Sequence, residues 1–243
     1  MLLSHLSRGR CRPSLRFPEA RTEAADALQH HKFGGLKGLR RHGHYKDVRL
    51  ADPFQEMMLH FPNPLAADNW LTSCFGRSLV CTVPTEPLYA LDRGRLIKTR
   101  CALFLQTSEG PVADFVSRTP DEETGQKWQQ FQLIVQAHGF RPQLRTLEDI
   151  RCNTPRLQNL ERMRQHLVQY VGDPRAHKAV APVERFFRKT PFTTLGALCD
   201  ALSSDLLPRG AIECAAISLY RLGAIDMNIS EAAYGDQTTL QLL

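Results

Sequence analysis

The chain has 243 residues, which is long enough for one large domain or two modest ones. Its hydrophobic content of 42% and charged content of 23% are ordinary for a globular protein, and no apolar run approaches the roughly 18 residues of a membrane span. The seven cysteines include no CxxC pair. The absence of such a pair and the odd number of cysteines together argue against a zinc site or a disulfide framework, and indicate a cytoplasmic protein with reduced thiols.

The net charge of +6 is concentrated at the N-terminus. Residues 1–50 hold 11 Lys and Arg against 4 Asp and Glu, whereas the other 193 residues hold 20 against 21. Each Lys or Arg placed on a phosphate releases condensed counterions. We therefore interpret residues 1–50 as a basic, weakly ordered arm that contacts DNA, although a tail that only adds solubility is an alternative. The candidate DNA-binding residues are Lys37, Arg40, Arg41, Lys46 and Arg49.

The next 120 or so residues predict one α/β domain, placed at 51–172. Apolar positions after Pro62 and Pro64 predict a helix, and a strand-rich block follows. The strands are expected at residues 78–83, 87–91, 95–98, 102–106 and 112–116, separated by turns. Residues 123–138 predict a helix that Gly139 ends, and residues 140–145 predict a further strand. This order of a helix, three or four antiparallel strands, a helix and a strand predicts a central sheet.

The last part of the chain predicts short helices. Thr154 and Pro155 start a helix that runs to about residue 170, and residues 172–182 predict an interdomain break. Helix signals at 183–188, 193–202 and 209–222 precede a strand at 224–229, a pattern typical of a winged helix, which we place at 180–243. In the third of these helices, Arg209 and Arg221 are the residues that could meet phosphate.

A family resemblance begins at residues 139–151, GFRPQLRTLEDIR, which are followed by Asn159. This segment is similar to the end of TnsA-type nuclease domains, the endonuclease subunits of heteromeric DNA transposases. Residues 87–95 resemble the strand and turn before the catalytic strand of that family, and residues 215–227 resemble its C-terminal winged helix. The resemblance, over roughly residues 50–240, implies an α/β restriction-endonuclease-like core with a mixed central sheet, followed by a helical winged-helix domain.

The family's catalytic pattern is not preserved. It reads Glu … Asp … (Glu/Gln)-x-Lys, in which carboxylates hold Mg²⁺ and the lysine polarises the attacking water. Matched by position, the glutamate and the aspartate correspond to Ala66 and Ala102. The Glu-x-Lys pair corresponds to Asp114 and Val116, so one carboxylate remains as a remnant. We expect no cofactor, unless Mg²⁺ serves a surviving nuclease activity.

The four matched positions are expected in one region at the end of the sheet that faces the first helix. Because burying a lone carboxylate is costly, Asp114 is expected to reach solvent or to pair with Arg118.

The resemblance implies a nuclease-deficient, DNA-binding subunit that bridges a DDE-type transposase subunit and an AAA-type ATPase regulator of transposition, without a membrane. One alternative is an active metal-dependent DNA endonuclease in which Glu56, Glu86 or Asp92 assists Asp114. The other is a basic winged-helix regulatory protein unrelated to transposition.

Overall fold

The computed structural model describes residues 48–76, 80–84, 86–118 and 122–243. This part of the chain is mixed α/β, with seven helices and a mixed four-stranded central sheet, as expected from the sequence. None of its helices is long and apolar enough to cross a membrane. The six cysteines within the described ranges are free thiols.

The described chain begins with a hairpin that the sequence did not predict. Strands β1 (Val48–Asp52) and β2 (Met57–Phe61) pair antiparallel, and the Oδ1 atom of Asp52 closes their turn by accepting a hydrogen bond of 2.8 Å from the Phe54 N–H. Val48 and Leu50 are buried. The expected weakly ordered arm of residues 1–50 therefore needs correction at its end, because residues 48–50 belong to a strand.

The central sheet has the strand order β3-β6-β7-β8. Its strands are β3 (Val80–Thr82), β6 (Leu103–Thr107), β7 (Gly110–Ser117) and β8 (Arg141–Thr146). The first three pair antiparallel, whereas β8 runs parallel to β7. A parallel neighbour needs a crossover connection, which helix α3 (Glu122–Ala137) provides.

The two faces of this sheet are covered by different helices. Along β7, alternate side chains point to opposite faces. Val112 shares a buried cluster with Trp70 of α2 (Pro64–Cys74) on one face. On the other face, Phe115 packs against Phe131 and Trp128 of α3, with ring centroids 5.2 and 5.9 Å away. The sheet is thus enclosed between α2 and α3.

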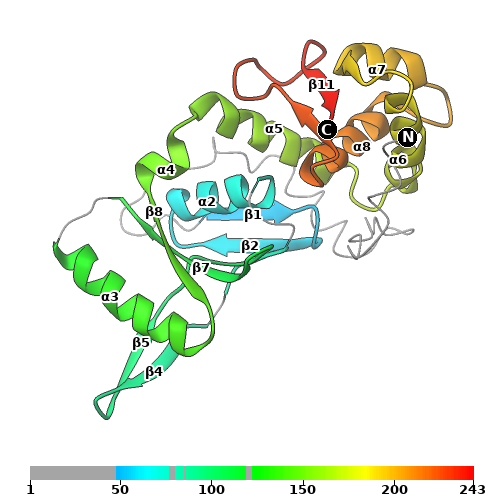
Figure 1. Ribbon diagram of the computed structural model, residues 1–243. Helices are drawn as coiled ribbons and strands as arrows, with labels where there is room; N and C mark the ends of the chain where they lie inside the picture. The colour runs from blue at the N-terminus through cyan, green and yellow to red at the C-terminus, as the bar shows by residue number, and fades with distance from the viewer. Residues whose placement is uncertain (1–47, 77–79, 85, 119–121) are drawn as a thin grey trace.

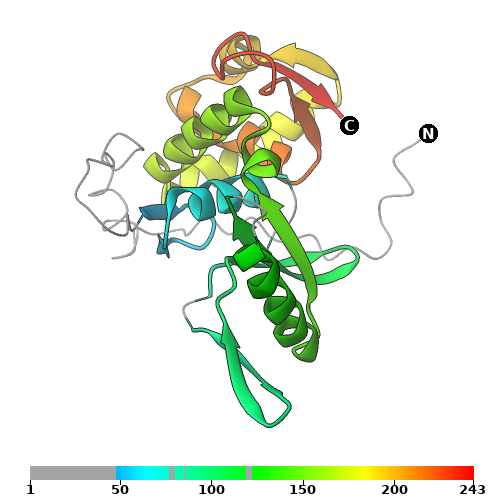
Figure 2. The ribbon, with the colours of Figure 1, turned by 90° about the vertical axis from the view of Figure 1, so that its left-hand side faces the viewer.

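A second hairpin projects from the body of the molecule (Figures 1 and 2). It consists of β4 (Leu88–Asp92) and β5 (Arg95–Thr99), joined by the two-residue turn of Arg93 and Gly94. Both turn residues have positive φ, 46° and 79°, as tight two-residue hairpin turns require.

Three helices continue the chain after β8. They are α4 (Leu147–Arg151), α5 (Thr154–Gln169) and α6 (Pro174–Phe187). Asp173 caps α6, so only a short turn separates it from α5. The helix expected at 183–188 is therefore the end of a longer one, which occupies most of the stretch 172–182 where the sequence predicted a break.

The C-terminal elements form a second, smaller sheet with two helices. They are β9 (Phe192–Thr194), α7 (Leu195–Leu202), α8 (Arg209–Arg221), β10 (Ile225–Met227) and β11 (Thr239–Leu242). The three strands pair antiparallel in the order β10-β11-β9. Between Ala211 and Leu219 every residue of α8 except Glu213 is buried, because α8 packs against α5, α6 and α7.

The core is continuous between the two ends of the described chain. One cluster of buried apolar residues includes Val48 of β1, Trp70 of α2, Ile217 of α8 and Leu240 of β11. Arg221 reinforces the connection: its Nε atom donates to the Cys74 carbonyl at 3.0 Å, and its guanidinium lies 3.7 Å from the centroid of the Phe54 ring. The last turn of α8 is therefore fastened to the end of α2.

Candidate nucleic-acid interface

Asp114 is a fully buried carboxylate in the middle of the sheet, on β7. Its Oδ2 atom accepts a hydrogen bond of 2.8 Å from Nδ2 of Asn69, which is also fully buried on α2. The Oδ1 atom of Asn69 accepts a longer bond of 3.3 Å from Nε of Arg145 on β8. Asp114 was expected to reach solvent or to pair with Arg118, and the first of these expectations is wrong, because the side chain is fully buried. The Asn69 amide satisfies part of its hydrogen-bonding capacity, which lowers the cost of burial.

The other matched positions lie on β7 or on segments that contact it. The Ala102 N–H donates to the Asp114 carbonyl at 2.9 Å, and Val116 follows two residues later on the same side of β7. Ala66, which is 3% exposed, lies on α2 about one turn before Asn69 and in the same buried cluster as Val112. The degenerate positions thus occur on α2, before β6 and on β7, and of these elements α2 provides a hydrogen bond to the Asp114 side chain, through Asn69.

The groups next to Asp114 do not fit a magnesium ion. Arg145 can only donate, so it must face the amide oxygen of Asn69, which directs the amide nitrogen toward Asp114. Mg²⁺ needs oxygen ligands. Within the described ranges, no group of three His, Cys, Asp or Glu side chains could hold a metal ion. The possible helpers of an active endonuclease, Glu56, Glu86 and Asp92, do not form such a group with Asp114.

Cys101 also lies beside Asp114 but is not a reactive thiol. Its Sγ atom donates to the carbonyls of Leu103 and Asp114, at 3.0 and 3.4 Å. Burial raises the pKa of the Cys101 thiol to about 12. The thiol is therefore protonated at neutral pH and cannot act as a nucleophile.

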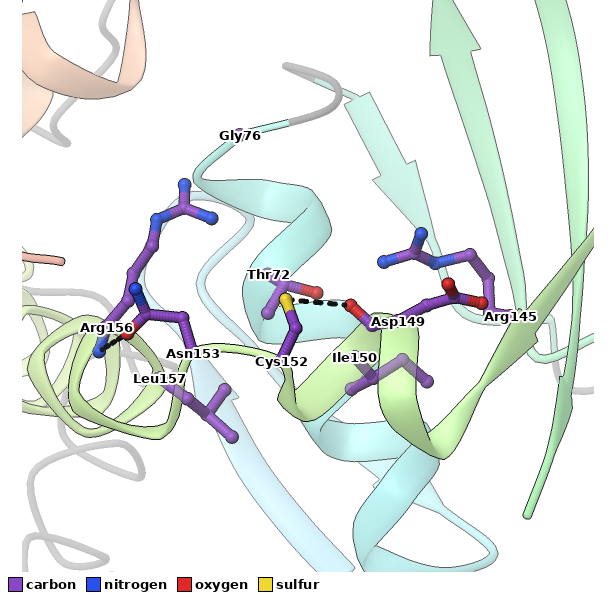
Figure 3. Close-up of a pocket in the computed structure, with 9 residues that line it drawn as sticks. All are labelled: Thr72, Gly76, Arg145, Asp149, Ile150, Cys152, Asn153, Arg156 and Leu157. Atoms are coloured by element: carbon purple, nitrogen blue, oxygen red, sulfur yellow. Dashed lines mark hydrogen bonds between the residues drawn. The ribbon is translucent and has the colours of Figure 1, made fainter. Parts of the chain in front are cut away.

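A pocket of about 230 Å³ opens between α2, α4 and the start of α5 (Figure 3). Arg145 and Arg156 lie on opposite sides of it. Arg156 is held by Tyr220, since its Nη2 atom donates to the hydroxyl at 3.4 Å. The pocket is lined by Thr72, Gly76, Arg145, Asp149, Ile150, Cys152, Asn153, Arg156 and Leu157. Through Arg145, it is connected to the Asn69–Asp114 pair.

The charge of this pocket is positive on balance. Two arginines face one acid, Asp149, whose Oδ2 atom accepts hydrogen bonds from the backbone N–H and the hydroxyl of Thr146 at 2.9 and 2.8 Å. The hydrogen bond from the Thr146 N–H is the largest cause that lowers the pKa of Asp149, and the bond from the Thr146 hydroxyl is the next. This acid is therefore ionised at neutral pH. Its carboxylate is engaged in capping α4, whereas the planar guanidinium groups suit a phosphate oxygen pair.

Of the five candidate DNA-binding residues, Arg49 lies within the described ranges, and it does not line this pocket. Lys37, Arg40, Arg41 and Lys46 lie outside the described residues. Arg49 is exposed on β1, opposite His60 in the strand register.

The two arginines of α8 are engaged elsewhere. Arg209 pairs with Glu213 at 3.0 Å, with Asp200 at 3.8 Å and with Asp236. Burial lowers the pKa of Arg221, which packs on Phe54. The expectation that these arginines could meet phosphate is not supported by their surroundings.

Sequence reasoning missed Asn69 and Arg145. The signal for Asn69 was its spacing of three residues from Ala66, which places both on adjacent turns of one helix side. Arg145 had no such signal, because its position opposite Val116 depends on the parallel register of β7 and β8.

Comparison of the chain with protein-family models finds no match, and comparison with curated proteins finds none either.

Proposed function

We propose that this protein is a nuclease-deficient, TnsA-like subunit of a DNA transposition complex, which binds DNA without cutting it. The observation that carries the proposal is the Asn69–Asp114 pair of 2.8 Å, because an amide donates to the carboxylate at the position matched to the family's metal site. Phosphodiester hydrolysis by this class of enzyme needs a metal ion held by several oxygens. A single carboxylate that already accepts from an amide does not provide them.

The order of elements supports a restriction-endonuclease-like core. Helix α2, strands β3, β6 and β7, helix α3 and strand β8 follow one another around a mixed sheet, with β4 and β5 as an inserted hairpin. A mixed central sheet is also what the family resemblance implies. The order α6, β9, α7, α8, β10, β11 similarly supports a winged helix.

The pocket with Arg145 and Arg156 supports contact with a phosphate backbone. Arginine binds phosphate with two parallel hydrogen bonds, and each such contact strengthens binding by counterion release. The basic segment before residue 48 would add to this non-specific attraction.

We assign the C-terminal elements to protein contacts within the complex, with the DDE-type transposase subunit and the AAA-type ATPase regulator as the proposed partners. Helix α8 occupies the position at which a DNA-binding winged helix has its recognition helix. Since most of α8 is buried, it cannot enter a DNA groove in this structure.

Binding and cleavage assays test this function with one set of proteins. We expect the wild-type protein to bind duplex DNA and to leave plasmid DNA intact in Mg²⁺ and in Mn²⁺. The double variant R145Q/R156Q should bind more weakly, with a salt-dependence slope reduced by up to about 1.8, since each phosphate contact contributes about 0.9. The variant R185Q/R188Q removes the same charge from exposed positions of α6 and its C-cap and serves as the matched control.

Two results would contradict the proposal. Metal-dependent cutting by the wild-type protein that Asp114→Ala abolishes would favour the active endonuclease. Equal losses of DNA affinity in R145Q/R156Q and in the control would show that the pocket has no specific role.

A further inference from the structure

The β4–β5 hairpin has an apolar outer face that no described element covers. Leu91 and Leu96 are directly paired across the strands and are 76% and 68% exposed. Tyr89, on the same face two residues before Leu91, is 46% exposed. Leucines are rarely this exposed as a contiguous pair at the end of a projecting element, and such apolar surfaces mark interaction sites.

Basic side chains are distributed along this hairpin, two of them at the tip and two toward its base. Residues 88–100 contain one acid, Asp92, and four exposed cations, a net charge of +3. The cations are Arg93, Arg95, Lys98 and Arg100. An apolar surface with a rim of this charge is complementary to a polyanion whose interior is apolar, which describes the phosphates and stacked bases of a duplex.

The base of the hairpin is held firmly by α3. Leu88 packs against the buried cluster that contains Phe131, and Nε2 of Gln130 donates to the Lys98 carbonyl at 3.1 Å. The ring Nε2 of His138 lies 2.8 Å from the Tyr89 carbonyl. These contacts use the inner face of the hairpin and its backbone, so the tip projects from the body as Figure 2 shows.

We propose that the β4–β5 hairpin is a DNA-contacting arm whose tip enters the minor groove, where Leu91 and Leu96 wedge against a base step and Arg93 and Arg95 contact the flanking phosphates. Apolar wedges of this kind partly unstack a step and kink the duplex by about 20–90°. The inference rests on the proposed function only in that the protein must bind DNA. It assigns DNA bending to an element distant from the Asn69–Asp114 pair.

The experiment uses the full-length protein and distinguishes the effect of the apolar side chains from the effect of the positive charges. L91S/L96S removes the apolar tip and keeps all charges, whereas R93Q/R95Q removes two cations and keeps the leucines. L206S is the matched control for the first, because Leu206 is 86% exposed in the turn before α8. Bending is measured by energy transfer between dyes at the duplex ends, base unstacking by 2-aminopurine fluorescence, and phosphate contacts by the salt dependence of binding.

We expect wild-type protein and L206S to bend the duplex and to raise 2-aminopurine fluorescence. L91S/L96S should lose both signals and keep the salt slope, and R93Q/R95Q should reduce the slope by up to about 1.8. Thermal melting should be the same for all variants, since the changed side chains are exposed.

Each contrary outcome has its own meaning. If the wild-type protein binds no DNA, the proposed function fails. If the wild-type protein binds DNA without bending it, or if both hairpin variants bind and bend DNA as the wild-type protein does, the proposal of a DNA-contacting arm is wrong. The proposed function would still stand. If light scattering gives L91S/L96S a different molecular mass from wild type while DNA bending is unchanged, the tip is a contact between protein copies. That result would also contradict the proposal that the hairpin is a DNA-contacting arm.

Discussion

Thr146 and Asp149 show how single residues shape the pocket. The Oγ1 atom of Thr146 accepts from the Asp149 N–H at 3.2 Å, and the Asp149 carboxylate accepts from the Thr146 N–H and hydroxyl in return. This reciprocal cap starts α4, a helix of five residues, directly after the strand that carries Arg145. The cap thus fixes the point at which the chain leaves strand β8 and begins helix α4, which lines the pocket.

Thr146→Ala should therefore lower the free energy of unfolding by about 1 kcal/mol, the usual effect of losing an N-cap hydroxyl. Hydrogen bonding lowers the pKa of Asp149 in the folded state. The stabilisation is present above the ordinary aspartate pKa of 3.8 and is lost as the pH falls through the lowered value. Urea unfolding should show a constant difference between variant and wild type from about pH 5 to 8, narrowing below about pH 4. A difference independent of pH would show that Asp149 does not take part.

The residues of the candidate site were only partly predictable. Asp114 followed from its place in a family-like strand, but its burial did not, because the partner that permits it comes from Asn69, 45 residues earlier. A lone carboxylate is costly inside a protein, whereas one that accepts from a buried amide is not. Sequence spacing cannot show such a contact between a helix and a sheet.

At the scale of elements, α5 and α8 cross closely because Gly210 lacks a side chain. A Cβ atom there would lie 1.8 Å from the Tyr170 hydroxyl oxygen. Tyr170 stacks on His166, with ring centroids 5.3 Å apart, and Nε2 of His166 lies 3.1 Å from the Gly210 carbonyl oxygen. The two helices are therefore in close contact at Gly210, through the Tyr170 ring and through the His166 ring.

Gly210→Ala should destabilise the protein by about 1–3 kcal/mol, because the added methyl group displaces the Tyr170 ring. Gly125→Ala is the control: Gly125 is exposed on α3 with open space at its Cβ position, so alanine should be neutral or stabilise by up to about 1 kcal/mol. Denaturant unfolding compares the two. If Gly210→Ala unfolds like Gly125→Ala, the contact between α5 and α8 is looser than described.

The positions of the strands were predicted well, but the central sheet is smaller than expected, because β4 and β5 form a separate two-stranded sheet. The predicted strands between residues 78 and 116 match β3 to β7 closely, since turns and alternation delimit them. β1 was missed because four of its five residues are buried, which hides the alternation, and β9 because it has three residues. The break expected at residues 172–182 is only a short turn, because α6 already begins at Pro174.

At the scale of the whole molecule, the shared core limits how the chain can be shortened. Because β1 begins at Val48 and is buried, a test of the basic arm must remove residues 1–47 and keep the strand. Those 47 residues carry ten Lys and Arg against four Asp and Glu, a net +6. Removing them leaves a chain of no net charge.

This truncation should weaken non-specific DNA binding and flatten its salt dependence by about 0.9 for each phosphate that the shortened protein no longer neutralises. Binding is measured on the same duplex between 50 and 200 mM salt, with unfolding curves to verify that β1 remains intact. An unchanged affinity and slope would show that the segment adds only solubility.

The end of α8 contacts two separate parts of the protein through neighbouring residues. Tyr220 and Arg221 are consecutive residues: the first holds Arg156 at the pocket, and the second holds the carbonyl of Cys74 at the end of α2. Asn69, which donates to Asp114, lies on the same helix α2. The last turn of α8 therefore contacts both the pocket and the helix that carries Asn69, so one helical turn joins the C-terminal elements to the surroundings of the buried carboxylate.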